Sequence, residues 1–126
     1  MAGEPIEGQV LVLTAAKASV QPNRLPDLVD RAQALLRPKL EDYRREYERL
    51  HADDGLEVFA VEWGHWEELG DELEVTEREL SAIRRAHEEQ LLRIGRRTDR
   101  EATFGTALEI REPVCIGTNG ESERSD

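Results

Sequence analysis

The stretch that most constrains the fold begins at Thr76, where T-x-x-E comes directly before a long segment of helical periodicity. In a capping box, the threonine side chain and the glutamate three residues later each bond a backbone N–H that the first helical turn leaves free. Thr76 and Glu79 fit this pattern, and Gly95 stands in the usual place for a C-cap. The sequence therefore predicts a long helix that carries on one side Leu80, Ile83, His87, Leu91 and Ile94.

Apolar residues at steps of three and four also predict helices over residues 23–36 and 38–50. Asn23 is a suitable N-cap for the first of these helices. Pro38 should end that helix and begin the next, because proline lacks the N–H that a helix interior needs. The segment "HADDG" at 51–55 is interpreted as a turn.

Two shorter apolar segments leave more than one interpretation. Residues 9–19 suit a helix that buries Val10, Leu13 and Ala16, although "QVLVL" alone would also suit a short strand. "LEVFAV" at 56–61 is either a brief strand or the beginning of the next helix. Periodicity alone does not separate the two structures in runs this short.

The rest of the chain predicts two more helices. One covers residues 66–73, and a second T-x-x-E, Thr98 with Glu101, predicts a last helix that ends before Pro113. Together these segments predict an all-α fold, a compact bundle of five to six helices with helix-turn-helix-like corners. The alternative adds one minor β-strand pair, formed by "LEVFAV" and "VCIG".

A single domain is expected, because 126 residues can bury a core without metals or disulfides. Residues 1–8 predict a flexible N-terminus, residues 9–116 the helical domain, and residues 117–126 a disordered acidic tail. The only cysteine, Cys115, excludes an intramolecular disulfide and favours a reducing compartment. The longest apolar run is far shorter than the roughly 20 residues of a membrane span. We therefore expect a cytoplasmic protein without membrane contact.

The charge balance is strongly acidic, with 28 carboxylates against 17 bases and a net charge of −11. Fifteen of the bases are arginine, and the only lysines are Lys17 and Lys39. An acid-rich, lysine-poor surface suits a protein that must stay hydrated in concentrated salt. At about 1 M salt the Debye length is only about 3 Å, so net charge then says less about partners than usual.

Residues 68–85 resemble the helix-turn-helix of DNA-binding regulators. The positions that this motif buries are apolar here: Leu69, Leu73, Val75, Leu80 and Ile83. Glu74 departs from the motif, because it occupies the turn where glycine or another small residue is usual. Residues 53–79 also hold eleven carboxylates against one base, Arg78, and this stretch would repel phosphates.

The basic stretch lies directly downstream, at residues 84–100, with six arginines against three carboxylates. Helical i,i+4 ion pairs would explain part of it, as in Arg84 with Glu88. Otherwise the acidic and basic stretches could meet across a subunit interface. The candidate contacts to DNA or to a partner protein are Arg78, Ser81, Arg84, Arg85, Arg93, Arg96 and Arg97.

Catalytic and metal-binding motifs are missing from the sequence. It contains no phosphate-binding or dinucleotide-binding glycine loop, no nucleophile elbow and no metal-ligand spacing. In "WGHW", Trp63 and Trp66 are three residues apart, so we expect both to anchor the core. Cys115 stands in an apolar run and should be a buried, inert thiol. We expect no enzyme, no cofactor, no metal and no small-molecule substrate.

Four stretches resemble a group of small acidic haloarchaeal proteins of unassigned function: "EGQVLVLTAAKASVQPNRLPDLVDRAQ", "YRREYERLHADD", "GHWEELGDEL" and "TALEIREPV". The resemblance covers most of residues 6–116 and implies a cytoplasmic, halophilic protein. It implies no catalytic or binding residues.

These observations favour a non-catalytic module for protein–protein interaction or self-association, as a homodimer or with a protein partner. Its contact surfaces would be the acidic stretch 53–79 and the arginines of 84–100. The alternative is a helix-turn-helix transcriptional regulator, in which Arg78, Ser81, Arg84 and Arg85 project toward DNA.

Overall fold

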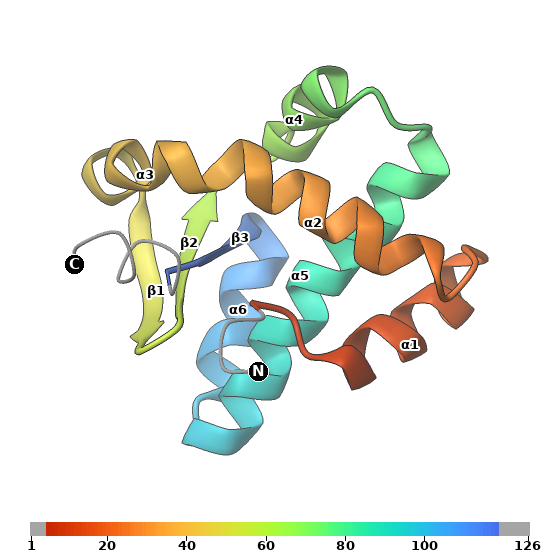
Figure 1. Ribbon diagram of the computed structural model, residues 1–126. Coiled ribbons are helices and arrows are strands. Elements are labelled where there is room, and N and C mark those ends of the chain that lie inside the picture. The colour runs from red at the N-terminus through yellow and green to blue at the C-terminus, as the bar shows by residue number, and fades with distance from the viewer. Residues whose placement is uncertain (1–4, 119–126) are drawn as a thin grey trace.

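A computed structural model describes residues 5–118 of the chain (Figure 1). In chain order the elements are α1 (Gly8–Ala18), α2 (Arg24–Leu36), a 3-10 turn η1 (Arg37–Lys39), α3 (Leu40–Glu46), β1 (Glu48–Asp53), β2 (Leu56–Val61), α4 (His65–Leu73), α5 (Glu77–Thr98), α6 (Glu101–Ile110) and β3 (Glu112–Gly117). The fold is therefore mixed, and the prediction of an all-α bundle is wrong.

The strands form one antiparallel sheet in the order β1-β2-β3. Every residue of β2 is buried, and its middle residue Val58 pairs with Cys115 of β3. The alternative strand pair of "LEVFAV" with "VCIG" is thus confirmed. What the sequence analysis missed is β1, which covers residues assigned to a helix and a turn, and the sheet is larger than a minor pair.

The missed strand has a physical cause. The helical spacing of apolar residues runs on to Leu50, but the chain becomes extended at Tyr47, with φ −127° and ψ 155°. The apolar strand β2 needs a hydrogen-bonding partner on each edge, and residues 48–53 supply the second one. Asp54 and Gly55 make the tight turn between them, a common two-residue hairpin connection. Tertiary pairing therefore overrides a local helical pattern.

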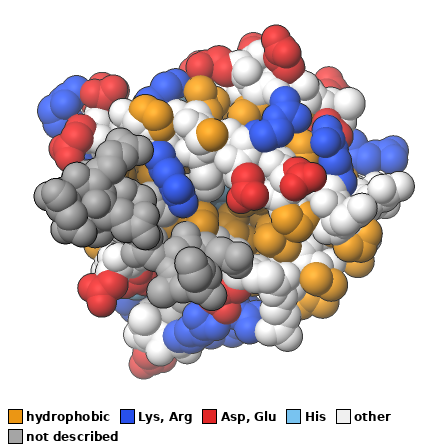
Figure 2. Space-filling view, in the orientation of Figure 1, with side chains coloured by type: hydrophobic (Ala, Val, Ile, Leu, Met, Phe, Trp, Pro, Cys, Tyr) orange, Lys and Arg blue, Asp and Glu red, His pale blue; other side chains and the backbone are white. Residues whose placement is uncertain are grey.

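The first helix is confirmed, but its buried face differs from the prediction. The structure buries Val10 and Leu11 and exposes Leu13, at 53%. A continuous apolar run fits several helical faces equally well, so the sequence did not fix the orientation. Figure 2 shows apolar side chains at the surface over α1, at the lower right. Ile6 is only 1% exposed, so the core begins before residue 9, where the domain was expected to begin.

Helices α2 and α3 follow each other almost without interruption across the upper part of Figure 1. Pro38 lies in the 3-10 turn between them, as its missing N–H requires. Asn23 occupies the N-cap position of α2, but its side chain forms no capping hydrogen bond. The prediction of two helices separated at Pro38 is confirmed, with the second ending at Glu46.

The long helix α5 runs through the middle of the fold and contacts α1, α2, α4, α6 and β3 (Figure 1). Its capping box is confirmed: the Glu79 N–H donates to Thr76 Oγ1 and the Thr76 N–H donates to Glu79 Oε1, both at 3.1 Å. The helix continues past Gly95 to Thr98, so the predicted C-cap is wrong. A Cβ on Gly95 would lie 3.0 Å from Glu101 Cα, which explains the glycine by close helix packing.

The capping box predicted at Thr98 and Glu101 does not form, unlike the one at Thr76 and Glu79. The Thr98 hydroxyl donates to the Ile94 carbonyl at 2.8 Å, within α5, and α6 begins after Arg100 without a side-chain cap. The predicted tail disorder falls mainly on residues 119–126, which lie outside the described residues. Among residues 5–118, no helix is both long and apolar enough to cross a bilayer.

Candidate functional site

The corner between α4 and α5 consists of two helices joined by a short turn. Helix α4 ends at Leu73, residues 74–76 form the turn, and α5 begins at Glu77. Glu74 adopts the left-handed conformation, with φ 58°, and its N–H donates to the Gly70 carbonyl at 3.0 Å. A glutamate therefore occupies a backbone position that favours glycine.

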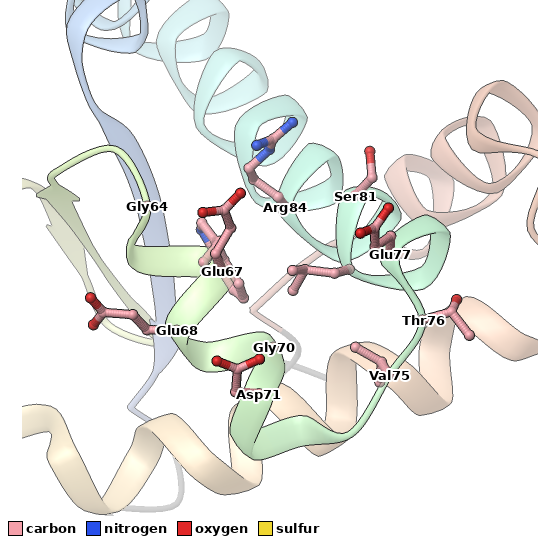
Figure 3. A pocket seen from close by; sticks show the side chains of 12 residues that line it. Gly64, Glu67, Glu68, Gly70, Asp71, Val75, Thr76, Glu77, Ser81 and Arg84 are labelled. Atoms are coloured by element: carbon pink, nitrogen blue, oxygen red, sulfur yellow. The ribbon is translucent and has the colours of Figure 1, made fainter.

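A groove of about 710 Å³ lies inside this corner, between α4 and the first half of α5 (Figure 3). Three of its lining residues are apolar and are called the floor here: Trp66, Val75 and Leu80. Five others are charged and are called the rim, four of them acidic and one basic: Glu67, Glu68, Asp71, Glu77 and Arg84. The groove therefore combines an apolar base with a negatively charged rim.

Close packing and a buried carboxylate build the groove. Gly70 packs against the Leu80 side chain, and a Cβ on Gly70 would lie 2.7 Å from Leu80 Cδ2. Glu112 of β3 is 3% exposed and accepts hydrogen bonds from the N–H groups of Trp66 (3.0 Å) and Gly64 (3.3 Å). It thus caps the first turn of α4 with a negative charge. The Trp66 indole N–H also donates to the Pro113 carbonyl at 2.9 Å, which fixes α4 to the sheet.

Within the described part of the chain, the rim carboxylates Glu67, Glu68, Asp71 and Glu77 form no ion pair. The one base, Arg84, is divided between two other carboxylates, with Nε 3.7 Å from Glu88 and Nη1 3.9 Å from Glu112. The groove thus carries an excess of negative charge that residues 5–118 leave without cationic partners.

The seven residues expected to contact DNA or a partner do not form one patch. Arg78, Ser81 and Arg85 are exposed on the first half of α5, and Ser81 also lines the groove together with Arg84. Between residues 5 and 118, neither Arg78 nor Arg85 forms an ion pair. These two arginines are therefore free to meet a partner.

The other three arginines bind the protein's own carboxylates. Arg97 holds Glu7 through both terminal nitrogens, at 2.5 and 2.6 Å, and Arg93 Nε lies 3.2 Å from the same carboxylate. The Arg97 hydrogen bond is the main cause that lowers the pKa of Glu7. Arg96 lies 3.6 Å from Glu101. The basic stretch is thus largely neutralised within the fold.

Behind the groove floor lies a buried histidine that sequence reasoning assigned only to a helix face. His87 is fully buried, contacts the Trp66 ring edge-on at 4.6 Å, and accepts the Cys115 N–H at Nδ1 (2.9 Å). Burial lowers the pKa of His87 to about 3. Burial also raises the pKa of the Cys115 thiol, which lies 3.7 Å from the His87 carbonyl oxygen. The predicted buried thiol is confirmed.

The two tryptophans do not share a face, contrary to the prediction. Trp66 is buried, but Trp63 is 57% exposed because Gly64 turns the chain between them, with φ 96°. The sequence also gave no direct sign of the groove. The available signals were the glycine in α4, Gly70, and the excess of acidic residues in and around that helix.

Residues 4–118 match a protein family that is described as a domain of unknown function. No curated protein and no solved structure matches the chain. The expectation of a family without an assigned function is therefore confirmed. Because the match covers nearly the whole chain, the protein belongs to this family, DUF8048.

Proposed function

We propose that this protein is a non-catalytic interaction module that binds a positively charged segment of a partner protein in the α4/α5 groove. The observation that carries the proposal is the set of four rim carboxylates around an apolar floor, none of which forms an ion pair with any residue that the structure describes. Arginine and lysine match such a surface, because their aliphatic stems cover apolar groups while their charged heads reach carboxylates.

The charge of the groove favours a basic protein segment over the other partners considered. Nucleic acid would bring phosphates to a rim of carboxylates, which costs binding energy. A second copy of this chain carries the same net charge of −11, so association at low salt would work against repulsion. Exposed Arg78 and Arg85 are the groups through which a second copy would bind.

The setting that we propose is the cytoplasm of a haloarchaeon. The excess of carboxylates over bases and the presence of only two lysines support it. In concentrated salt, long-range attraction is screened within a few ångströms, at about 3 Å for about 1 M salt. Recognition there would depend on direct contact with the rim carboxylates and with the apolar residues of the floor.

The alternative is a helix-turn-helix regulator of transcription. It is favoured by the form of the α4–α5 corner and by the exposure of Arg78, Ser81 and Arg85 on α5. The acidic groove beside these residues opposes it, because α4 would lie across the phosphate backbone. Retention of the protein on DNA at moderate salt would support this alternative.

Binding of a labelled peptide tests the proposal. The probe is a fluorescent peptide that alternates arginine and leucine, followed by anisotropy, with the glutamate–leucine analogue as a negative control. The variant Glu67→Gln/Asp71→Asn should weaken binding about tenfold, since two charge-assisted contacts are lost. The matched variant Asp30→Asn/Glu109→Gln removes the same charge from α2 and α6 and should leave binding within about twofold of wild type.

Equal weakening by both double variants would contradict the proposal, because binding would then follow net charge and not the groove. Light scattering of the wild type decides on the second copy. A dimer that Glu67→Gln/Asp71→Asn dissociates, without peptide binding, would assign the groove to self-association.

A further inference from the structure

A second pocket lies beside α4, between that helix and α3, with a volume of about 270 Å³. It shares only Glu68 with the groove. Three aromatic side chains form part of its wall: Tyr43, Tyr47 and His65. None of these three rings lines the α4/α5 groove.

The three rings contact one another in a fixed arrangement. The Tyr43 ring lies 5.0 Å from Tyr47 at an interplanar angle of 42° and 5.5 Å from His65 at 86°. The Tyr47 and His65 rings are also 5.5 Å apart, at 77°. The Tyr43 hydroxyl lies 2.5 Å from His65 Nε2, and Tyr43 itself is buried. The pocket thus has a preorganised wall of mutually inclined rings.

The backbone that carries these rings is held firmly. Arg44, next to Tyr43 in α3, donates to both carboxylate oxygens of Glu57 in β2, at 3.0 and 2.6 Å. His65 is the first residue of α4, whose first turn Glu112 caps. Tyr43 and His65 therefore come from two helices that are each tied to the sheet, and Tyr47 directly follows α3.

The pocket is also negatively charged. Four carboxylates line it with a single base, Lys39: Asp42, Glu46, Glu68 and Glu72. Lys39 pairs with Glu72 at 3.4 Å, and Asp42 pairs with Arg45 at 2.5 Å. Across residues 5–118, Glu46 and Glu68 form no ion pair. These two carboxylates give the aromatic wall a negative field, and burial together with that field raises the pKa of Tyr47.

We propose that this pocket binds an alkylated ammonium group, which would rest against the Tyr43, Tyr47 and His65 rings and balance Glu46 and Glu68. Aromatic rings attract organic cations through their negative faces, and the attraction grows when the cation is desolvated. Alkyl groups favour this site over a bare ammonium ion, because they spread the charge and lose little hydration in an apolar wall. The carboxylates of the pocket would repel an anion.

The ammonium group has two sources with the same chemistry. It could be a free small ion, or it could be the methylated lysine side chain of a peptide. The inference does not rest on the proposed function, because the groove and the pocket lie on different sides of α4 and share one residue. Groove variants at Glu67 and Asp71 should leave the pocket unchanged, so failure of one idea does not bring down the other.

The first experiment titrates the full-length protein with tetramethylammonium chloride and, in parallel, with 3,3-dimethylbutan-1-ol, a neutral molecule of similar shape. Amide chemical shifts report the location of binding. The cation should shift the amides of residues 39–47 and 65–72, and the neutral molecule should bind at least about tenfold more weakly. Equal binding of the two molecules, or shifts confined to other regions, would overturn the proposal.

Variants of Tyr47 separate the ring from the fold. Tyr47→Leu should weaken tetramethylammonium binding about tenfold, while Tyr47→Phe, which keeps the ring, should remain within about twofold of wild type. Trp63→Leu removes an exposed aromatic residue outside the pocket and should have no effect. If Tyr47→Leu fails to fold by circular dichroism, Glu46→Gln serves instead and should weaken binding about threefold. Wild-type affinity in the folded variant would overturn the proposal.

A peptide with one trimethyl-lysine distinguishes the two sources. Binding more than about tenfold tighter than that of tetramethylammonium, lost with the unmodified lysine peptide, would assign the pocket to a partner's side chain. Equal affinity of the peptide and the free ion would assign it to a small ligand. Both outcomes support the pocket, and no shift from either probe would overturn it.

Discussion

The two ends of α5 use charge in opposite ways. At its beginning, the helix borders a groove whose four rim carboxylates find no cationic partner in the described chain. Toward its end, Arg93 and Arg97 are held by a single carboxylate, Glu7, which arrives from the other end of the sequence. The acidic surface stays available to a partner, while much of the basic surface is already used.

This difference shows why charge counted along a sequence is a poor guide to charged surface. The stretch 84–100 has three more bases than carboxylates, yet one glutamate about ninety positions away forms ion pairs with two of its arginines. The acidic stretch 53–79 contains no comparable arrangement around its groove. The proposed binding surface is therefore the part of the charge that folding leaves unpaired in the described chain.

The largest expected effect is a loss of folding stability in acid, to which His87 and Glu7 should contribute over different pH ranges. Burial lowers the pKa of His87 to about 3, whereas the unfolded histidine titrates at its ordinary value of 6.5. Below pH 6.5 the unfolded state therefore binds a proton that the folded state refuses, and stability falls by about 3 kcal/mol by pH 4. The Arg97 hydrogen bond lowers the pKa of Glu7, so that group's contribution is complete above 4.5 and disappears only as pH falls further.

Urea unfolding at a series of pH values measures the pH range over which each group changes stability. His87→Asn keeps an acceptor for the Cys115 N–H but removes the titrating ring, so its stability should fall less steeply between pH 6.5 and 5. Glu7→Gln should keep the wild-type slope in that window. Parallel curves for wild type and His87→Asn would show that His87 is not the source of the acid sensitivity.

The buried carboxylate of Glu112, which caps α4, should contribute more to the free energy of unfolding at pH 7 than the carboxylate of Glu7, which pairs with the end of α5. Glu112→Gln replaces one acceptor oxygen by an NH2 group, so either the Gly64 or the Trp66 N–H loses its acceptor, and the change should cost about 2 kcal/mol. Glu7→Gln should cost about 1 kcal/mol or less, because its ion pairs with Arg93 and Arg97 are partly exposed and screened by solvent. Chemical denaturation at pH 7 compares the two, and a larger loss for Glu7→Gln would reverse the interpretation.

Local signals predicted the helical part of the fold well. The capping box at Thr76, the apolar stripe of α2 and the break at Pro38 each depend on chemistry within a few residues. The strand β1 could not be found in this way, because its pairing with β2 is a tertiary event and its own apolar residues follow a helical period. The Asp-Gly turn at 54–55 was the one local sign of the hairpin.

The candidate site was predictable in composition but not in shape. The acidic stretch was visible in the sequence, but the groove depends on the packing of α4 against α5, where Gly70 lies beside the Leu80 side chain. The pairing of Glu7 with Arg97 has no local signal, because the two residues are brought together by the packing of α1 on α5. The aromatic wall at Tyr43 and His65 likewise joins two helices separated by a hairpin.

Two helical glycines should respond differently to alanine: Gly70 in α4, beside the beginning of α5, and Gly95 near the end of α5. Gly95→Ala places a Cβ 3.0 Å from the backbone Cα of Glu101, so α6 must move, and we expect a loss of about 1.5 kcal/mol. At Gly70 the clash is with the end of the flexible Leu80 side chain, and the better helix propensity of alanine offsets it. Gly70→Ala should stay within about 0.5 kcal/mol of wild type. Thermal unfolding measures both, and equal losses would contradict this distinction.

The smallest effect concerns the left-handed residues that close α4 and α5. Glu74 has φ 58° and Asp99 has φ 59°, so both backbones favour glycine equally, but aspartate tolerates this conformation better than glutamate. Glu74→Gly should therefore raise the free energy of unfolding by about 0.5 kcal/mol, after the greater entropy of unfolded glycine is subtracted. Asp99→Gly should raise the free energy of unfolding by only about 0.2 kcal/mol. Urea midpoints for the pair decide the matter, since a loss of stability in Glu74→Gly would mean that the glutamate side chain stabilises the corner of the groove.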